Sequence, residues 1–251
     1  MSSKQIVLQP AYVLHQWAYR DSSAIVELFT PEHGRIGVVA RGVKRPKSPW
    51  RGLLQPFQPL LVSWRGGGEL KTLAEVEAQG MALQLPSQPL VSGFYLNELL
   101  MRLVARLDAQ LTLFGCYDAS LRALAVVQDD AALERVLRYF ERDLLAALGY
   151  ALVLDCEVKT GRPLTQAQVY DYQIERGPVG LAEAEAGQGI AVHGSTLLAI
   201  RQADLSDPQA RREAKRLMRA VLARYLGPKP LFSRQLLARR SNNTERAERH
   251  Q

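Results

Sequence analysis

The chain has 251 residues, of which 47% are hydrophobic, so it is long enough to form one large domain or two ordinary ones. It carries no apolar run of about 18 residues, no secretory signal at its start and only two cysteines, so we expect neither a membrane span nor a disulfide framework, and a cytoplasmic location. The formal net charge of +7 at pH 7 permits binding to a polyanion but does not by itself indicate one.

Short apolar runs separated by turn residues make up the first third of the chain. These runs are rich in β-branched and aromatic side chains, as strands are. His33-Gly34 and the three glycines at 66–68 fit hairpin turns, where a positive φ is needed. Strands are predicted at residues 13–17, 24–29, 36–40, 60–64 and 70–76. Short strands so closely spaced favour a small β-barrel, with a sandwich as the alternative.

Beyond residue 84 the apolar residues recur at spacings of three and four, which indicates helices. Asp207 and Pro208 fit the N-cap and first turn of a helix, and Gly149 is placed to end another. Ser195 is predicted to cap a short helix that begins at Thr196. The longer helices are predicted from Gly93 past Leu107, over 120–127, over 133–148, and from Pro208 to Leu226.

The pattern as a whole predicts an α+β protein with more than one domain. A five-stranded barrel at 1–83 precedes a mainly helical domain at 84–235. Residues 151–193 are rich in glycine and short of periodicity, so we expect an irregular insert there. The polar stretch 236–251 is predicted to be disordered.

One stretch of the predicted barrel carries positive charge and no acidic residue. Residues 33–68 contain no Asp or Glu, and residues 41–51 are broken by Pro46 and Pro49, so this segment should be an exposed loop. Uncompensated cations on a loop suit phosphate oxygens; an ordinary solvated loop is the alternative. The cations of the window are Arg35, Arg41, Lys44, Arg45, Lys47, Arg51 and Arg65.

Three aromatic residues, Trp50, Phe57 and Trp64, lie among or just after these cations. Aromatic faces beside a cationic groove are used in sequence-tolerant binding of single strands, where each stacked base contributes about 1–3 kcal/mol. Core packing is the favoured role for Phe57 and Trp64. Trp50, flanked by Pro49 and Arg51, is the better stacking candidate.

A second basic surface is predicted on the last helix, at i, i+4 spacing. It could extend a path for DNA, although an ordinary solvated face is favoured. Its members are Arg211, Arg212, Lys215, Arg216 and Arg219.

Motifs for catalysis or metal binding are missing from the sequence. The four histidines are scattered, no C-x-x-C occurs, and neither a Walker loop nor a G-x-S-x-G elbow is present. We therefore expect no enzyme, no metal and no cofactor. Two rivals to a DNA-binding protein stay open: an RNA-binding or ribosome-associated protein, and a nuclease that uses scattered carboxylates.

Five segments, in this order along the chain, resemble the RecO family of bacterial recombination mediators. They are 34–42 (GRIGVVARG), 51–60 (RGLLQPFQPL), 69–73 (ELKTL), 95–100 (YLNELL) and 226–234 (LGPKPLFSR). The resemblance implies an N-terminal OB-fold, a helical domain, and binding to single- and double-stranded DNA. It also implies annealing of complementary strands without ATP, and cooperation with RecR in loading RecA onto strands coated by single-strand-binding protein (SSB).

The resemblance further assigns residues to two sites. The DNA-binding region corresponds to Arg35 and the five cations of 41–51. The acidic C-terminal tail of SSB, which ends in Phe, would dock beside Arg138, Phe140 and Arg142; in the alternative reading these arginines pair with Glu134 and Glu141.

Two departures from the family are visible. Some members carry a four-cysteine zinc site in the insert, whereas only Cys156 lies near that stretch here, so no zinc is expected. Pro228 and Phe232 replace an expected Gly and Lys, which puts a DNA role for that turn in doubt.

Overall fold

The structure, a computed structural model, describes residues 5–181 and 189–233, and the predicted disordered tail at 236–251 lies outside the described residues. The chain divides into two compact units. One contains the described residues up to Val126 together with Pro230–Ser233, and the other contains Val127–Lys229. The first unit therefore includes two helices as well as the strands, whereas the sequence-based division ended the first domain at residue 83.

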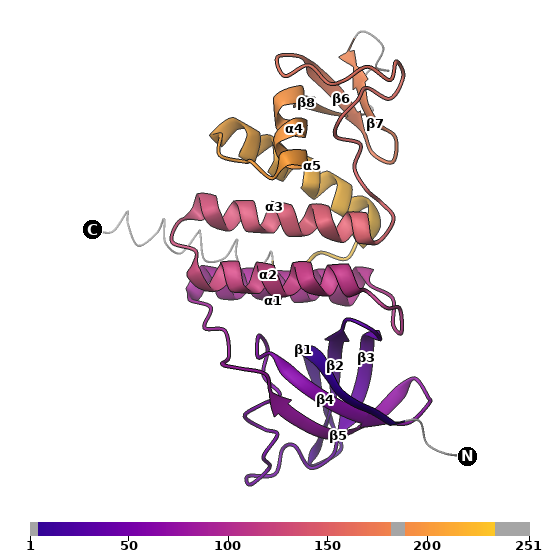
Figure 1. Ribbon diagram of the computed structural model, residues 1–251, viewed down its shortest axis with the longest axis vertical. Coiled ribbons are helices and arrows are strands. Elements are labelled where there is room, and N and C mark those ends of the chain that lie inside the picture. Colours follow the sequence, from indigo (N-terminus) through magenta and orange to yellow (C-terminus); the bar gives the residue numbers. More distant parts are fainter. Residues whose placement is uncertain (1–4, 182–188, 234–251) are drawn as a thin grey trace. The chain divides into compact units, whose positions relative to one another are not determined.

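The strands of the first unit form a closed barrel in the order β1-β2-β3-β5-β4, which confirms the predicted five-stranded OB-type barrel (Figure 1). Neighbouring strands are antiparallel except β3 and β5, which are parallel. The strands are β1 (Gln5–Tyr19), β2 (Ser23–Thr30), β3 (Gly34–Ala40), β4 (Leu60–Arg65) and β5 (Leu70–Ala78).

Strand β1 is much longer than the predicted residues 13–17 because it has two partners. Its first part pairs with β4 and its second part pairs with β2. The register shifts between Val13 and His15, so one extra residue there changes which side chains face inward. The interior holds small and β-branched side chains together with Trp64. Phe57 is also buried, so core packing of Phe57 and Trp64 is confirmed.

Helices α1 (Ser87–Leu103) and α2 (Leu111–Val126) belong to the same unit as the barrel. The predictions for both were wrong at their ends: α1 starts before Gly93 and stops before Leu107, and α2 begins nine residues ahead of 120. The backbone of Val104 is extended, with a φ of −84° and a ψ of 129°, and this ends α1 at Leu103. Tyr12 and Phe29 pack against Phe114 of α2, so aromatic side chains join this helix to the barrel.

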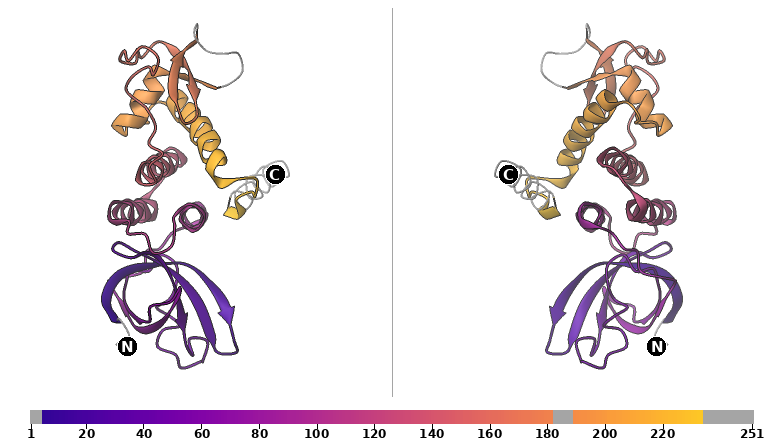
Figure 2. Two further views of the ribbon diagram at one scale, coloured as in Figure 1. Left: turned by 90° about the vertical axis from the view of Figure 1, so that its right-hand side faces the viewer. Right: turned by 90° about the vertical axis from the view of Figure 1, so that its left-hand side faces the viewer.

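Within the residues that the structure describes, the second unit combines three helices with a small sheet (Figure 2). The strand order of this sheet is β7-β6-β8. The expectation of an irregular insert was therefore wrong in part, because β6 and its neighbours pair regularly around the buried Tyr170 and Tyr172. The elements are α3 (Asp130–Ala147), β6 (Val169–Gln173), β7 (Gly177–Gly180), β8 (Ile190–His193), α4 (Gly194–Gln202) and α5 (Pro208–Leu226).

A side-chain cap sets the N-terminus of two of these helices. The Asp207 carboxylate accepts a hydrogen bond from the Ala210 N–H at 2.7 Å, and α5 covers the predicted residues. Helix α3 starts three residues before 133, because Asp129 caps it by accepting from the Ala132 N–H at 2.6 Å.

The predicted Ser195 cap of α4 was wrong. The helix begins at Gly194, its N-cap is His193, and the His193 side chain makes no capping hydrogen bond.

Candidate nucleic-acid interface

The connection between β3 and β4 displays the basic segment 41–51, called here the basic loop. Arg41, Lys44, Arg45, Lys47 and Arg51 are all exposed, and none forms an ion pair with any residue that the structure describes. This agrees with the prediction of uncompensated charge. At a spacing of a few residues, such cations repel one another unless an anion is bound.

Buried side chains and backbone hydrogen bonds give the basic loop a defined backbone. Val43 and Leu54 are buried in the barrel core. The Lys44 N–H donates to the Ser22 carbonyl at 3.0 Å, and the Ser48 N–H donates to the Arg45 carbonyl at 3.0 Å. Because backbone and apolar contacts hold the loop, its cationic side chains are left to project into solvent.

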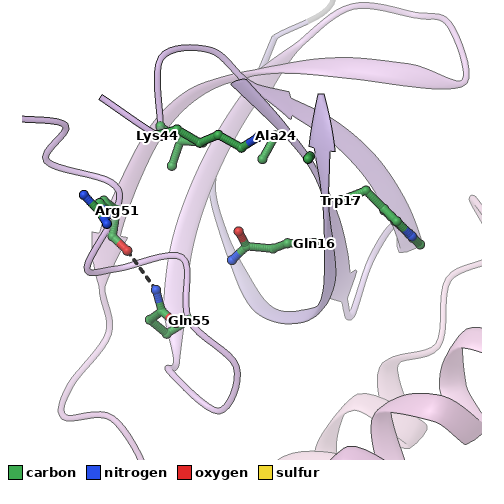
Figure 3. A pocket seen from close by; sticks show the side chains of 8 residues that line it. Gln16, Trp17, Ala24, Lys44, Arg51 and Gln55 are labelled. Atoms are coloured by element: carbon green, nitrogen blue, oxygen red, sulfur yellow. Dashed lines mark hydrogen bonds between the residues drawn. The ribbon is translucent and has the colours of Figure 1, made fainter. Parts of the chain in front are cut away.

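A pocket of about 450 Å³ lies at this end of the barrel (Figure 3). Lys44 and Arg51 line it from the loop, and Gln16 lines it from β1. The Gln55 side-chain amide donates to the Arg51 carbonyl at 2.8 Å, which fixes one wall. The remaining lining residues are Trp17, Ala18, Ala24 and Val43.

Arg35 does not share the environment of the loop cations, and its assignment to the DNA site needs correction. Its Nε lies 3.1 Å from a carboxylate oxygen of the fully buried Glu27, and its guanidinium donates to the Met101 carbonyl. Arg106 forms a second ion pair with Glu27 at 2.6 Å. This countercharge lies outside residues 33–68 in the sequence, and the pairing of β2 with β3 brings Glu27 opposite Gly37.

Two further residues were predicted for the interface, and the structure supports an accessible position for only one of them. Arg65 is exposed at the end of β4, as expected for a residue that could meet phosphate. Trp50 is only partly exposed and packs against the barrel core, so it is not the free stacking face that its neighbours in the sequence suggested.

The basic stripe on α5 is partly used by its own unit. Arg211 donates to the Leu205 carbonyl at 3.1 Å, Lys215 pairs with Glu134, and Arg216 donates to the Ala191 carbonyl. Arg212 and Arg219 are exposed. The hydrogen bonds of the first three favour the reading of this stripe as an ordinary helix face.

The predicted SSB-tail residues lie on α3. Arg138 is 5% exposed, and its guanidinium pairs with the buried Glu141 at 2.7 Å. Phe140 is buried. Arg142 is more accessible and donates to Asp143 and to the Ile200 carbonyl, each at 2.8 Å. The alternative reading is thus correct for the pairing of Arg138 with Glu141.

Glu213 on α5 has a role that sequence reasoning missed, because its partners come from another part of the chain. Its carboxylate accepts from the His193 N–H at 3.0 Å and from the Thr196 hydroxyl at 2.7 Å, and it contacts the His193 ring at 2.7 Å. Burial acts to raise the pKa of Glu213, but these hydrogen bonds outweigh it and lower the pKa to about 2. Glu213 therefore ties α5 to the residues that begin α4, whereas the first N–H groups of α4, those of Gly194 and Ser195, donate to the Gln168 and Gln166 carbonyls.

Metal ligands do not gather anywhere in residues 5–181 and 189–233: no group of three or more His, Cys, Asp or Glu side chains there could hold an ion. Among the helices that the structure describes, none combines the length and apolar character needed to cross a membrane.

Comparison with known proteins gives the same family across nearly the whole chain. The model of the Recombination protein O N terminal domain matches residues 1–81, and that of the C terminal domain matches residues 89–235. The DNA repair protein RecO of Nitrosococcus oceani is 50% identical over 97% of this chain and 98% of its own. The proteins of the same name from Nitrosospira multiformis and Methylococcus capsulatus are 48% and 46% identical, over 91% and 92% of this chain and 93% of each relative. The chain therefore belongs to the RecO family of DNA repair proteins.

Proposed function

We propose that this chain binds single- and double-stranded DNA through the basic loop and anneals complementary strands without ATP. With RecR, it would then help to load RecA onto single strands coated by SSB. The observation that carries the proposal is the set of five exposed loop cations, which have no carboxylate partner among the described residues. Phosphate is the anion that such a surface fits, because binding releases the counterions condensed on the polynucleotide.

The mechanism is electrostatic and needs no covalent step. Two complementary strands repel each other through their phosphates, and cations of the loop neutralise part of that charge on both strands. Base pairing then supplies the free energy of annealing, so hydrolysis of a nucleotide is not required. This is consistent with a chain in which we expect neither a catalytic site nor a cofactor.

The SSB tail would bind to α3 in this proposal. An acidic peptide first meets Arg142, whose side chain is 23% exposed, and Arg138 beneath it pairs with Glu141. A carboxylate of the peptide would accept hydrogen bonds from these arginines, either beside their present acceptors or in place of them. Binding of this kind is weakened by salt and by an Arg142→Glu substitution, which leaves the buried Arg138–Glu141 pair intact.

The experiment that tests the proposed function is annealing of complementary oligonucleotides, bare and SSB-coated, over a range of salt. We expect faster annealing of both, with the advantage falling as salt rises. An RNA-binding protein of similar fold would leave coated strands unpaired. Strand cleavage on incubation of labelled DNA with Mg²⁺ or Mn²⁺ would instead support a nuclease and contradict the proposal.

A further inference from the structure

Three aromatic side chains line the outer surface of β1 beyond its bulge. Gln16 and Ala18 pair with Val26 and Ala24, which belong to the barrel core, so the three residues that alternate with Gln16 and Ala18 along the strand face outward. Figure 3 shows the side chains of Gln16 and Trp17 on opposite sides of the strand. We call His15, Trp17 and Tyr19 the aromatic ladder.

The ladder is accessible and continues into the neighbouring strands. Trp17 is 39% exposed, and its ring lies 4.6 Å from the ring of His15 at an angle of 65°. Trp17 pairs with Ile25, which in turn pairs with Val39, and both are only partly buried. An exposed indole within such an apolar row is a surface that gains free energy when another flat apolar group covers it.

Cations adjoin the ladder at its Tyr19 end. The Arg20 guanidinium lies 5.1 Å from the centre of the Tyr19 ring. The Gly42 N–H contacts the Ser23 hydroxyl at 3.4 Å, and the Lys44 N–H donates to the Ser22 carbonyl, so the basic loop is joined to the turn that follows the ladder. An apolar peptide has no anionic groups that could pair with these cations. A ligand with flat faces and regularly spaced anions would use both features.

We propose that the aromatic ladder stacks the unpaired bases of a single strand whose phosphates bind the basic loop. The inference deepens the proposed function and rests on it. It moves the stacking site from Trp50, which packs against the core, to Trp17. Stacking holds a base by its face and leaves its pairing edge free, so a strand held in this way stays available to a complementary strand. Duplex DNA, whose bases are already stacked on one another, should not engage the ladder.

The test compares three probes of equal length: an oligothymidylate, the same backbone without bases, and a duplex. Anisotropy of labelled probes gives the affinity of the full chain for each. In wild type we expect the oligothymidylate to bind more tightly than the abasic strand. Trp17→Ala should weaken oligothymidylate binding by at least about fivefold and leave the other two within about twofold, because only base stacking is lost.

Matched variants separate stacking from folding. Trp17→Phe keeps an aromatic face and should retain most of the preference for bases, whereas Phe94→Ala removes an equally exposed aromatic residue from α1 and should change no affinity. Quenching of tryptophan emission by oligothymidylate provides a second readout. It uses only Trp→Phe variants, so it stays valid even if Trp17→Ala fails to fold. The quenching should disappear in Trp17→Phe and persist in Trp50→Phe.

Each outcome bears on one of the two proposals. If wild type binds neither single-stranded probe, the proposed function fails. If wild type binds and Trp17→Ala keeps the wild-type ratio of oligothymidylate to abasic affinity, the ladder is not the stacking surface and the inference is overturned. The same conclusion follows if quenching is lost with Trp50→Phe instead of Trp17→Phe.

Discussion

The basic loop and the basic stripe of α5 each carry five cations, but the two sets differ in how many of their members have partners within the folded chain. The loop cations have no ion pair within the described chain. On α5, by contrast, Lys215 pairs with Glu134, and Arg211 and Arg216 donate to backbone carbonyls of their own unit. The difference teaches that a count of cations does not identify an anion-binding surface. What matters is whether the folded chain already supplies acceptors for them.

The largest effect should follow from reversing the loop charges. In a variant with Arg41→Glu, Lys44→Glu and Arg45→Glu, we expect the affinity for single-stranded DNA to fall by more than about 100-fold, because phosphate contacts become repulsions. Anisotropy of a labelled oligonucleotide measures the loss. All three side chains are exposed, so the thermal unfolding midpoint should stay close to wild type. Unchanged affinity would remove the loop as the binding site.

A second prediction tests whether the charged Glu213 side chain on α5 stabilises the folded protein. Glu213→Gln should lower the free energy of unfolding by about 2 kcal/mol at neutral pH, because hydrogen bonds to a charged acceptor are lost. Glu175→Gln, which removes an exposed pair with Arg224, is the matched control and should cost at most about 1 kcal/mol.

The pH dependence of Glu213→Gln has a defined sign. The pKa of Glu213 is lowered from 4.5 to about 2 in the folded protein, so its contribution is complete above pH 4.5 and is lost as pH falls toward 2. The difference in stability between wild type and variant, followed by denaturant unfolding, should shrink over that interval. A difference that grows in acid would contradict the assignment of Glu213 as a charged hydrogen-bond acceptor.

Salt dependence sharpens the comparison without reversing any charge. If the five loop cations meet phosphates of single-stranded DNA, the log–log slope of affinity against salt should be about −3.5. Neutralising Arg41, Lys44 and Arg45 to Ala should reduce the magnitude of that slope by about 2. Titrations at several salt concentrations give both slopes. A variant slope equal to that of wild type would mean that these side chains meet no phosphate.

The smallest effect is expected on α5. Arg212→Glu together with Arg219→Glu reverses two exposed members of the stripe and should change DNA affinity by less than about threefold, through long-range charge alone. This variant also serves as a control for the loop reversal. A loss as large as that of the loop variant would show that the stripe belongs to the DNA path.

Local signals in the chain predicted much of this molecule. Strands β2 to β5 were found because alternating β-branched residues are bounded by turn glycines. The ends of α5 were found because Asp207 and Gly227 act through neighbours a few residues away. The first part of β1 was missed, since Gln5 to Pro10 are largely exposed and their strand conformation depends on pairing with β4.

The candidate site also has features that the sequence predicted and features that it did not. The absence of carboxylates from residues 33–68 and the two prolines were enough to predict an exposed cationic loop, because the prolines exclude a regular helix or a central strand and Lys and Arg side chains are rarely buried. The fate of Arg35 was not predictable from that window, since Glu27 comes from the neighbouring strand. The orientation of Trp17 depends on a bulge in the register of β1 with β2, and no pattern in the sequence marks it.

The amino-acid sequence thus determined the barrel, most of the helices and the surplus of positive charge, because propensity, capping and turn chemistry act between residues close along the chain. Only the tertiary structure decided which charges are compensated and which aromatic faces reach solvent. Those outcomes depend on strand register and on carboxylates that lie far away in sequence. A cation or an indole becomes a binding surface only when the packed fold provides it with no other partner.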